Sequence, residues 1–463
     1  MTFLLFFILS QHLFAQCWKE VATGTYHTLA IKTDGTLWAW GLNNFGQLGD
    51  GTTINKNVPT QIGTDINWLA INAETDNSIA LKTDGSLWTW GNNSSGQLGD
   101  GNHGIGVNNT IPTHIGNDTD WVKISTGGRT YAIKNNGTLW GWGDNNEGHL
   151  GVGNTNPYYT PTQIGSDTWI EINGGGGKTL AIKTNNTLWG WGMNKQGSLA
   201  IGPPSESIII TSPTQTGNNT ADWAKISVGS CCSSKMIKTD GSLWAMGSAS
   251  YGNIGTGSLV NVNTPTRVGN DNNWKTVTTE NHTCAIKIDN SLYVWGNNFQ
   301  GQLGVGNTTN INTPFQLNSN VTWIKSISSL THTVAIDSNG TLYSWGWNNY
   351  GQLGDGSTID KNTITQIGQS CPLGTTSFKV LQNVQVYPNP SNNVATISYK
   401  LSDSISIEVV IVNSLGQIIM NDIITAQKEN KEYQINTTNY SSGIYLITLK
   451  TATESVTVKL IKN

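Results

Sequence analysis

A repeat that opens with tryptophan constrains the fold of this chain more than any other feature. In the first unit, Trp18 leads to His27-Thr28-Leu29-Ala30-Ile31-Lys32, then to Leu37-Trp38-Ala39-Trp40-Gly41 and to Gly46-Gln47-Leu48-Gly49. Six further units, about 51 residues apart, open at Trp68, Trp121, Trp169, Trp223, Trp274 and Trp323. A period of this length is typical of arrays in which each unit is one supersecondary element. The array covers residues 18–368.

Each repeat has the pattern of short antiparallel strands. Apolar and other residues alternate in Leu29-Ala30-Ile31-Lys32 and in Leu37-Trp38-Ala39-Trp40, and this period of two is that of a β-strand. Pairs such as Asp34-Gly35 lie between these strands and tolerate the positive φ angles of a tight hairpin turn. No repeat has the pattern of a helix of ten or more residues. We therefore expect an all-β fold.

A single β unit of this size cannot bury both of its faces. Seven such sheets packed around an axis bury each face against a neighbour, which is the arrangement of a β-propeller. All 19 tryptophans of the chain lie in the repeats. At such recurrent positions, we expect them to pack between sheets, and platforms for stacking sugars are the alternative.

The repeat motifs have a family resemblance. The elements His27-Thr28-Leu29-Ala30-Ile31-Lys32, Asp34-Gly35-Thr36-Leu37-Trp38-Ala39-Trp40-Gly41 and Gly46-Gln47-Leu48-Gly49 resemble the repeat of the regulator of chromosome condensation family. The resemblance implies a seven-bladed propeller over residues 17–370. Members of the family include a guanine-nucleotide exchange factor that binds chromatin and secreted protein-binding platforms such as bacterial inhibitors of β-lactamase. With 25 basic and 29 acidic residues, the chain gives no reason to expect nucleic-acid binding.

The N-terminus predicts export. The apolar run Phe3 to Leu9 is far shorter than the roughly 20 residues of a membrane-spanning helix, and Ala15 supplies a small residue for cleavage. We expect residues 1–15 to be a signal peptide, and a lipoprotein modified at Cys17 is the alternative. No other run approaches transmembrane length, so we expect a secreted protein in which disulfides persist.

The last eighty residues form a different kind of sequence. Beyond a linker over 371–380, alternating segments separated by turns predict a small immunoglobulin-like β-sandwich over 381–463. This segment resembles the type A C-terminal sorting domain of the type IX secretion system. The resemblance implies passage through that machinery to the outer surface of a Gram-negative bacterium, and an ordinary adhesion domain is the alternative. The matching positions are Pro388, Asn389, Pro390, Gly416, Gly443, Tyr445, Lys459 and Lys462.

Residues able to do chemistry are few. His27, His282 and His332 share one repeat position, so we expect each to form a hydrogen bond within its own blade. Asp50, Asp100 and Asp355 follow Gly-Gln-Leu-Gly or its equivalent, and turn formation is expected there rather than calcium binding. The scattered acids Glu74, Asp76, Glu147, Glu171, Glu206 and Glu280 leave open that two of them converge across the ring. We predict no catalytic, metal or cofactor site, and a polysaccharide-acting enzyme with a site in the propeller mouth remains the alternative.

Two unusual loops are candidates for binding. These loops, 102–107 and 203–210, lie between the Gly-Gln-Leu-Gly element and the recurrent proline of the repeat, where rotational symmetry places all such segments on one face of the propeller. Loops on a rigid scaffold commonly mediate recognition. We therefore predict a monomeric, non-catalytic scaffold that binds a protein or surface glycan through His103, Ile105, Glu206, Ile208, Ile209 and Ile210.

The cysteines predict a bond that closes the ring. Cys17 lies one residue before Trp18, and Cys371 lies three residues after Gly368 at the end of the last repeat. In a closed propeller, the first and last repeats are neighbours, so we expect a Cys17–Cys371 disulfide. Cys284 lies at a core position and is expected to be a free thiol. Cys231 and Cys232 are either reduced or joined as a vicinal pair.

Overall fold

The computed structural model forms two compact units, Met1–Pro372 and Leu373–Asn463. It describes residues 17–126, 129–202, 208–216, 220–230, 233–317, 320–369, 371, 381–401, 405–413, 417–426, 429–451 and 455–463. The expected signal peptide over 1–15, all but the first residue of the expected linker, Cys231, Cys232, Glu206 and Gly416 lie outside the described residues.

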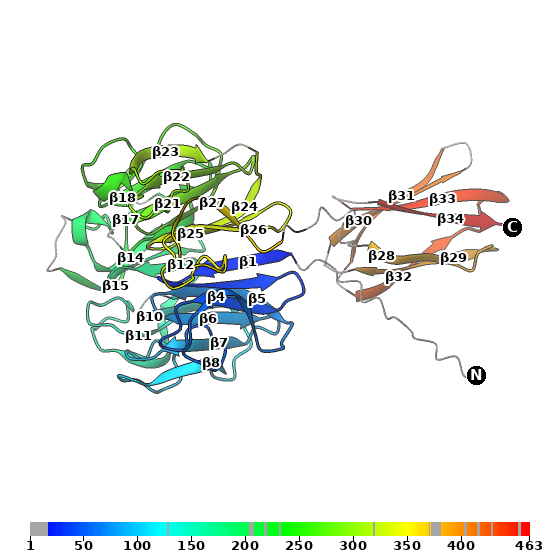
Figure 1. Ribbon diagram of the computed structural model, residues 1–463. Coiled ribbons are helices and arrows are strands. Elements are labelled where there is room, and N and C mark those ends of the chain that lie inside the picture. The colour runs from blue at the N-terminus through cyan, green and yellow to red at the C-terminus, as the bar shows by residue number, and fades with distance from the viewer. Residues whose placement is uncertain are drawn as a thin grey trace, which may run out of the picture. The chain divides into compact units, whose positions relative to one another are not determined.

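The first unit is a propeller of seven antiparallel blades (Figure 1). Blades 1, 2, 5, 6 and 7 are separate four-stranded sheets, each ordered as its strands follow along the chain. Their strands are β1 (Trp18–Thr23), β2 (His27–Lys32), β3 (Leu37–Gly41) and β4 (Lys56–Ile62); β5 (Trp68–Glu74), β6 (Asn77–Lys82), β7 (Leu87–Asn92) and β8 (Asn108–His114); β16 (Trp223–Val228), β17 (Ser233–Lys238), β18 (Leu243–Gly247) and β19 (Val262–Arg267); β20 (Trp274–Thr279), β21 (His282–Lys287), β22 (Leu292–Gly296) and β23 (Ile311–Leu317); and β24 (Trp323–Ser328), β25 (His332–Asp337), β26 (Leu342–Gly346) and β27 (Lys361–Ile367).

Blades 3 and 4 are joined by one long strand. The first part of β12 pairs with β11 as the outer strand of blade 3, and its second part pairs with β13 as the inner strand of blade 4. The joined sheet contains β9 (Trp121–Thr126), β10 (Arg129–Lys134), β11 (Thr138–Gly143), β12 (Tyr158–Gly175), β13 (Lys178–Lys183), β14 (Leu188–Met193) and β15 (Ile209–Gln215). Short 3-10 turns η1 (Lys195–Gly197) and η3 (Ser250–Gly252) lie in two of the loops.

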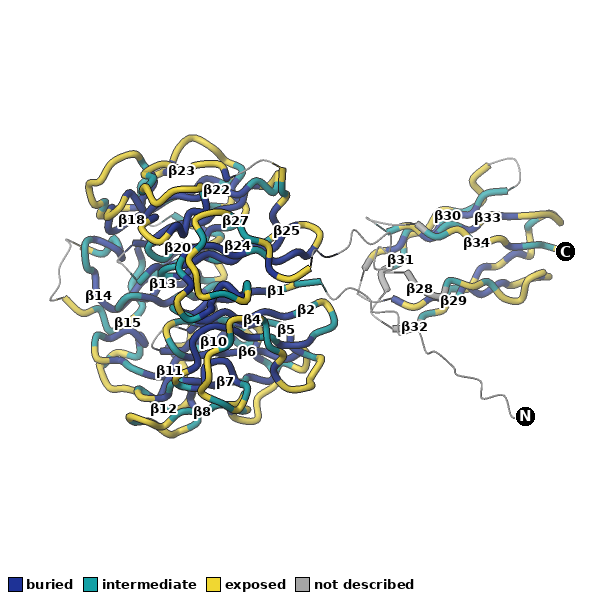
Figure 2. The backbone as a smooth tube through the Cα atoms, in the orientation of Figure 1, coloured by how far each residue is buried: buried dark blue, intermediate teal, exposed yellow. Residues whose placement is uncertain are grey.

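The antiparallel order of each blade defines two faces of the propeller. The connections from first to second strand and from third to fourth strand, such as 24–26 and 42–55 in blade 1, lie on one face, which we call the loop face. The hairpins from second to third strand, such as 33–36, lie on the opposite face, which we call the turn face. Buried segments concentrate in the first three strands of the blades, whereas the fourth strands and the peripheral loops are mostly half-buried or exposed (Figure 2).

In six of the seven blades, the tryptophan before the glycine that ends the third strand donates a hydrogen bond to a carbonyl of the preceding blade. In blades 1 and 2, for example, a hydroxyl of the second strand donates to the same carbonyl. The indole of Trp40 donates to the carbonyl of Gln352 at 2.9 Å, and the hydroxyl of Thr28 donates to the same oxygen at 2.9 Å. In the next blade, Trp90 and Ser78 share the carbonyl of Gln47 at 2.9 and 2.8 Å. This geometry explains why the His-Thr, Trp-Gly and Gly-Gln-Leu-Gly elements recur together. In blade 5, Met246 occupies the tryptophan position, within the core.

A second layer of tryptophans packs edge to face near the turn face. Trp68 contacts Trp88 with ring centroids 5.8 Å apart at 76°, and the ammonium of Lys82 lies 3.9 Å from the centroid of Trp88. Asp65 holds the same ammonium at 2.6 Å. Because this arrangement recurs around the ring, the repeated tryptophans have a structural explanation as core between and within blades.

The innermost strands are clasped to one another. The fifth residue of an inner strand accepts a hydrogen bond from a backbone N–H of the next blade. The pairs are Asn72 with Thr126 at 3.1 Å, Ser125 with Gly174 at 3.4 Å, Asn173 with Val228 at 2.6 Å, Ser227 with Thr279 at 2.9 Å and Thr278 with Ser328 at 3.1 Å. Ala22 and Ile327 occupy this position in blades 1 and 7 and have no acceptor. Both interfaces of blade 1 therefore lack the clasp.

The recurrent histidines also connect blades, so the prediction of bonds within a blade is wrong. The Nε2 atoms of His27, His282 and His332 lie 3.0, 2.6 and 3.3 Å from the hydroxyls of Ser78, Thr333 and Thr28. Each hydroxyl belongs to the second residue of the second strand in the following blade. The second strand of each of these blades packs against the first strand of an adjacent blade, so its first side chain faces that blade rather than its own sheet. The bond from His332 to Thr28 closes the ring.

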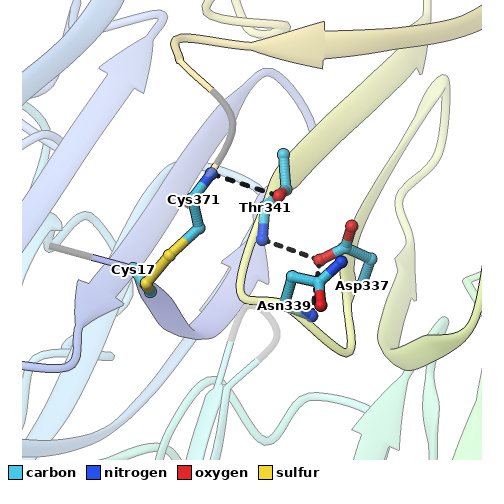
Figure 3. The surroundings of a disulfide bond; sticks show 5 residues. All are labelled: Cys17, Asp337, Asn339, Thr341 and Cys371. Carbon is cyan, nitrogen blue, oxygen red and sulfur yellow. Dashed lines mark hydrogen bonds between the residues drawn. A yellow bond between two sulfur atoms is a disulfide. The ribbon is translucent and has the colours of Figure 1, made fainter. Parts of the chain in front are cut away.

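A disulfide joins Cys17 and Cys371 at this closure, with their Cα atoms 5.4 Å apart (Figure 3). The backbone N–H of Cys371 donates to the Thr341 hydroxyl at 3.3 Å, and that of Trp18 donates to the carbonyl of Gly340 at 2.9 Å. Both cysteines thus lie against the hairpin of blade 7 on the turn face. Cys284 is a buried free thiol, and burial raises its pKa to about 12.

The second unit is a β-sandwich. One sheet has the order β28-β29-β32 and the other β31-β30-β33-β34. Alternate residues of the two sheets, such as Ile397 and Ile447, form one apolar core. The strands are β28 (Leu381–Tyr387), β29 (Val394–Leu401), β30 (Ile405–Asn413), β31 (Ile418–Ala426), β32 (Glu429–Asn436), β33 (Gly443–Lys450) and β34 (Ser455–Lys462).

Candidate functional site

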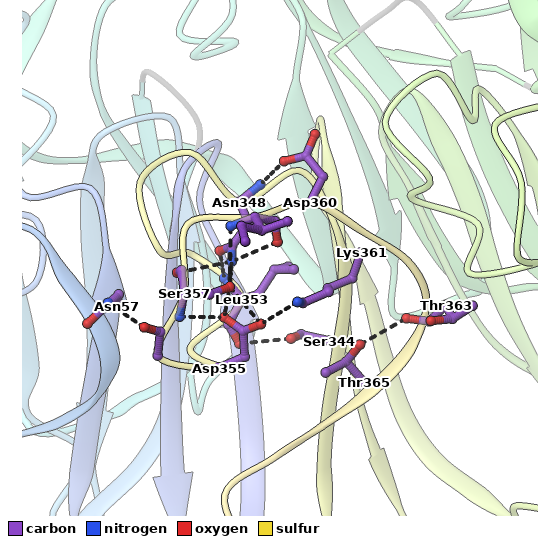
Figure 4. Close-up of polar contacts among 12 residues, drawn as sticks. Asn57, Ser344, Asn348, Leu353, Asp355, Ser357, Asp360, Lys361, Thr363 and Thr365 are labelled. Atoms are coloured by element: carbon purple, nitrogen blue, oxygen red, sulfur yellow. Dashed lines mark hydrogen bonds and ion pairs between the residues drawn. The ribbon is translucent and has the colours of Figure 1, made fainter.

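The loops between third and fourth strands are held by a fixed polar network. In blade 7, the Asn348 amide donates to an Asp355 carboxylate oxygen at 3.1 Å and to the carbonyls of Ser357 and Ile359 at 3.1 and 3.2 Å (Figure 4). Its own oxygen accepts the backbone N–H of Leu353 at 2.9 Å. One asparagine therefore organises the whole loop.

The aspartates of these loops serve the turns. Asp355 accepts from the backbone and hydroxyl of Ser357 at 2.9 and 2.8 Å and pairs with Lys361 at 3.3 Å. Burial acts to raise the pKa of Asp355, but these hydrogen bonds outweigh it and hold the pKa below its usual value. Asp50 has the same partners in Thr52, Asn43 and Lys56. Within the described residues, no three His, Cys, Asp or Glu side chains gather in an arrangement suited to a metal ion.

Large aliphatic side chains project from these loops in five blades. They are Ile54, Ile105, Ile208, Val260 and Ile359, and each is at least half exposed, with Ile105 fully exposed at 100%. Ile54 and Ile359 occupy the same repeat position, seven residues after the glutamine of Gly-Gln-Leu-Gly. The equivalent loop therefore exposes an apolar side chain in five of the seven blades.

The predicted binding residues lie partly in this set. His103 is exposed and stacks on Tyr159 of blade 3, with ring centroids 3.7 Å apart. Ile208 and Ile209 are exposed, but Ile210 is half-buried and packs against the cores of neighbouring blades. The expected exposed patch over 208–210 is therefore limited to its first two residues, because β15 turns the third side chain inward.

An aromatic group on the loop face was not expected from the sequence. Tyr26 lies in the first hairpin of blade 1, while Trp347 and Tyr350 lie in the long loop of blade 7. Their ring centroids are 4.9 Å apart for Tyr26 and Trp347 and 5.3 Å for Tyr26 and Tyr350. All three are half-buried. Trp347 occupies a position where other repeats have smaller residues such as Asn92. This departure from the repeat is the sequence feature that could have predicted the aromatic group.

The innermost strands of all seven blades surround a polar cavity at the loop-face end of the central channel, with a volume of 120 Å³. Thr23, Asn72, Thr126, Asn173, Ser227, Thr278 and Ile327 contribute one lining residue from each blade. The seventh residue of each repeat, counted from its opening tryptophan, is glycine or serine in five blades and glutamate in blades 2 and 6. These two glutamates, Glu74 and Glu280, also line the cavity.

Glu74 and Glu280 interact electrostatically although their blades are not adjacent. Burial, followed by the Glu280 carboxyl, raises the pKa of Glu74 well above its usual value, against the effects of Arg129 and Lys178. Burial also raises the pKa of Glu280, although Ser230 donates to its carboxylate from the backbone at 2.8 Å and from the hydroxyl at 2.5 Å. Two of the scattered acids therefore do converge across the ring.

Cationic side chains of blades 3 and 4, Arg129 and Lys178, act on this pair, and Lys178 also acts on Lys235 of blade 5. Lys178 donates to the carbonyl of Gly229 at 2.8 Å and so bridges blades 4 and 5. Arg129 and Lys178 occupy the bridging position that His27 has in blade 1. Lys235 is fully buried, and burial, together with the neighbouring Lys178 charge, lowers its pKa to about 7.

The sorting-signal residues of the second unit connect its two sheets. The side chain of Asn389 donates to the carbonyl of Lys459 at 2.7 Å and accepts from the backbone of Ile461 at 2.8 Å. Tyr445 is buried and donates to the carbonyl of Ser441 at 2.9 Å. The segment between Pro388 and Pro390 thus holds the last strand, on which Lys459 and Lys462 lie, and Gly443 begins the strand beside it.

Family models match both units. The regulator of chromosome condensation repeat matches residues 34–79, 84–132, 136–182, 240–286 and 289–336, and a second model of that repeat matches 18–47 and 328–352. The chain belongs to the regulator of chromosome condensation repeat family. The secretion system C-terminal sorting domain matches residues 385–463. This sorting domain indicates a protein secreted or displayed at the cell surface through the type IX secretion system.

Curated relatives match over parts of their length. The ultraviolet-B receptor UVR8 of Arabidopsis thaliana is 29% identical over 139 residues, which cover 29% of this chain and 31% of the receptor. The Ras guanine nucleotide exchange factor C of Dictyostelium discoideum is 43% identical over 47 residues, which cover 10% of this chain and 3% of that protein. The chain therefore spans less than a third of the relatives that it matches.

Solved structures share the propeller fold. Human WBSCR16 superimposes with a TM-score of 0.64 at 21% identity, over 70% of this chain and 88% of that one. Yeast RCC1 (Prp20), in its complex with Kap60, gives a TM-score of 0.65 at 18% identity, over 81% of this chain and 88% of the yeast chain. In the described part of the chain, no helix has the length and apolar character needed to cross a membrane.

Proposed function

We propose that this repeat-family propeller is a non-catalytic binding scaffold that captures a protein partner through its loop face. The observation that supports the proposal is the set of aliphatic side chains exposed on the equivalent loop of five of the seven blades. Apolar side chains exposed on loops that are themselves fixed by hydrogen bonds are a common feature of interaction surfaces. A glycan is the other ligand class, and the aromatic group of Tyr26, Trp347 and Tyr350 would be its stacking surface.

The sorting domain places this scaffold outside the cell in our proposal. Its expected route is a signal peptide across the inner membrane and the sorting domain across the outer membrane of a Gram-negative bacterium. Deleting residues 381–463 should leave a folded propeller that stays in the periplasm, because the propeller core lies within the first unit. Recovery of the truncated protein outside the cell at the normal level would contradict this route.

The loop face can be tested against the turn face of the same molecule. The loop variant has serine at Ile54, Ile105 and Ile359. The control has serine at Ile66 and Ile288, which lie on the turn face and are about as exposed as Ile54 and Ile359. Both variants should fold, since these side chains lie outside the core. Partner capture from surface extracts of the source cells, and glycan-array binding, should fall with the loop variant and persist with the control. Equal loss or equal retention would contradict the assignment.

A polysaccharide-acting enzyme is the second candidate, because Glu74 and Glu280 provide two neighbouring carboxyls whose pKa values are raised. A glycosidase needs such a pair, one as acid and one as base or nucleophile. However, the cavity of 120 Å³ is well below the roughly 300–1,000 Å³ of most small-molecule sites. Release of reducing ends from surface polysaccharides by the wild type, but not by Glu74→Gln, would establish this candidate over the scaffold.

A further inference from the structure

The cavity at the loop-face end of the channel is lined mainly by uncharged residues and by two acidic ones. Its described lining residues are mainly hydroxyl, amide, glycine and small apolar groups, and its ionisable members are Glu74 and Glu280. A volume of 120 Å³ holds about four water molecules at ~30 Å³ each, which is also enough for the polar end of one side chain. Rim residues such as Thr25 and Leu330 are half-exposed, so the cavity is reached from the loop face.

Glu74 is the unsatisfied member of the pair. The residue is half-buried, and no hydrogen bond or ion pair joins its carboxyl to another described residue. Glu280, in contrast, is fixed by the backbone and hydroxyl of Ser230. Arg129 and Lys178 act on Glu74 electrostatically but are not among the residues that line the cavity. A ligand in the cavity would therefore meet carboxyl groups and not the cations.

We propose that this cavity receives a basic side chain, lysine or arginine, of the protein partner and holds its cationic group between Glu74 and Glu280. The inference rests on the proposed docking of a protein on the loop face. Two carboxyls brought together in a partly buried site repel each other when both are ionised. An ammonium or guanidinium group removes that repulsion and supplies donors to carboxylate oxygens, and charge-assisted hydrogen bonds of this kind are the stronger ones.

The fold explains why this position suits a cationic side chain. Five of the seven blades have glycine or serine where blades 2 and 6 have glutamate. Side chains at all seven positions would fill the channel mouth, whereas two long acidic ones leave room between them. Because Glu74 retains its proton to a higher pH than an ordinary glutamate, cation binding should release a proton to solvent. Lys178 opposes this retention at both carboxyls, and Arg129 does so at Glu74.

The experiment uses the full-length protein and small probes. Binding of Nα-acetyl-lysine amide and Nα-acetyl-arginine amide, which keep their cationic side chains, is measured by titration calorimetry. Nα-acetyl-norleucine amide is the uncharged analogue. The cationic probes should bind and the uncharged analogue should not. Glu74→Gln and Glu280→Gln should each weaken binding about tenfold or more, the effect of losing one charge-assisted contact. Glu147→Gln is the matched control, because Glu147 lies on the same face, pairs with His149 at 2.8 Å and does not line the cavity.

Proton release provides a second measurement on the wild type alone. The apparent binding enthalpy of the cationic probes should vary with the ionisation enthalpy of the buffer. Equal binding of the uncharged analogue, unchanged affinity in both glutamine variants, or no binding of either cation would overturn the inference. Its failure is distinguishable from failure of the scaffold proposal, because partner capture is tested separately with the serine variants of Ile54, Ile105 and Ile359.

Discussion

The imidazole Nε2 of His332 in blade 7 lies 3.3 Å from the hydroxyl of Thr28 in blade 1. It repeats the bonds of His27 to Ser78 and of His282 to Thr333 between other adjacent blades. One hydrogen-bond pattern therefore serves both as the ordinary contact between blades and as the closure of the ring.

These histidines should make the propeller acid-sensitive. Burial lowers the pKa of His27, His282 and His332 to about 3, whereas the same groups titrate near 6.5 in the unfolded chain. Below about pH 6.5, the unfolded state binds more protons, so the free energy of unfolding falls as the pH falls towards 3. Each histidine contributes up to about 1.4 kcal/mol per pH unit in that range. Urea unfolding between pH 7 and 4.5 measures the slope.

The control for this slope comes from blade 2. Asn77 occupies the histidine position there and donates to Thr126 at 2.6 Å without titrating. His282→Asn should therefore keep the protein folded at pH 7 and reduce the pH dependence by the share of one histidine. Equal slopes in the wild type and the variant would show that this imidazole does not carry the effect.

Loss of the Cys17–Cys371 disulfide should lower stability. A cross-link across a loop this long restricts the unfolded chain by roughly 5 kcal/mol in the loop-closure model. The double variant Cys17→Ser and Cys371→Ser should unfold at lower urea concentration than the wild type under non-reducing conditions. Non-reducing peptide mapping checks the bond directly, and free thiols at both positions in the mature protein would contradict it.

The clasps between inner strands predict one loss and one gain. Asn173→Ala removes the acceptor of the Val228 N–H, and an unsatisfied buried donor costs about 1–3 kcal/mol. Ala22→Ser places at the unclasped interface of blades 1 and 2 the residue type that makes the clasp at Ser125 and Ser227, and it should add about 1 kcal/mol. Chemical unfolding measures both variants. A destabilising Ala22→Ser would mean that the blade 1 interface cannot accommodate the hydroxyl.

Asn389 should be needed for a stable sorting domain. Asn389→Ala removes two hydrogen bonds to the last strand, so β34 should become sensitive to protease and export should fall. Asn421→Ala is a suitable control, because Asn421 is exposed and bonds only one carboxylate on the same sheet. The amount of protein at the cell surface, measured for both variants, tests the prediction. Equal export would contradict it.

Repetition made the architecture predictable. Trp38, Trp40 and the Gly-Gln-Leu-Gly element recur, and this recurrence predicts the strands, the turns and the closed ring. It did not identify partners: His27 was assigned to its own blade, because a period reveals equivalent positions but not whether a side chain turns inward or to its neighbour. In the same way, the sequence left open which acids meet.

Departures from the repeat were informative only in part. Ile105 and Ile208 belong to loops that depart from the repeat, and this departure predicts them as binding residues. Ile54 and Ile359 follow the repeat, so the sequence does not distinguish them. Glu74 and Glu280 are 206 residues apart in number and meet only because blades 2 and 6 lie across one channel. Such a meeting depends on the diameter of the channel and the direction of two side chains, and neither is encoded in local sequence.

The bond between Cys17 and Cys371 also determines how the propeller bears mechanical force. The chain leaves the propeller after β27, the edge strand of blade 7, and tension on the segment beyond Cys371 would otherwise detach that strand from β26. The disulfide transmits the tension to Cys17 and so to β1, the first strand of blade 1, which contacts strands of blades 2 and 7. Tension applied beyond Cys371 is thus borne by the first strand of blade 1 as well as by the edge strand of blade 7.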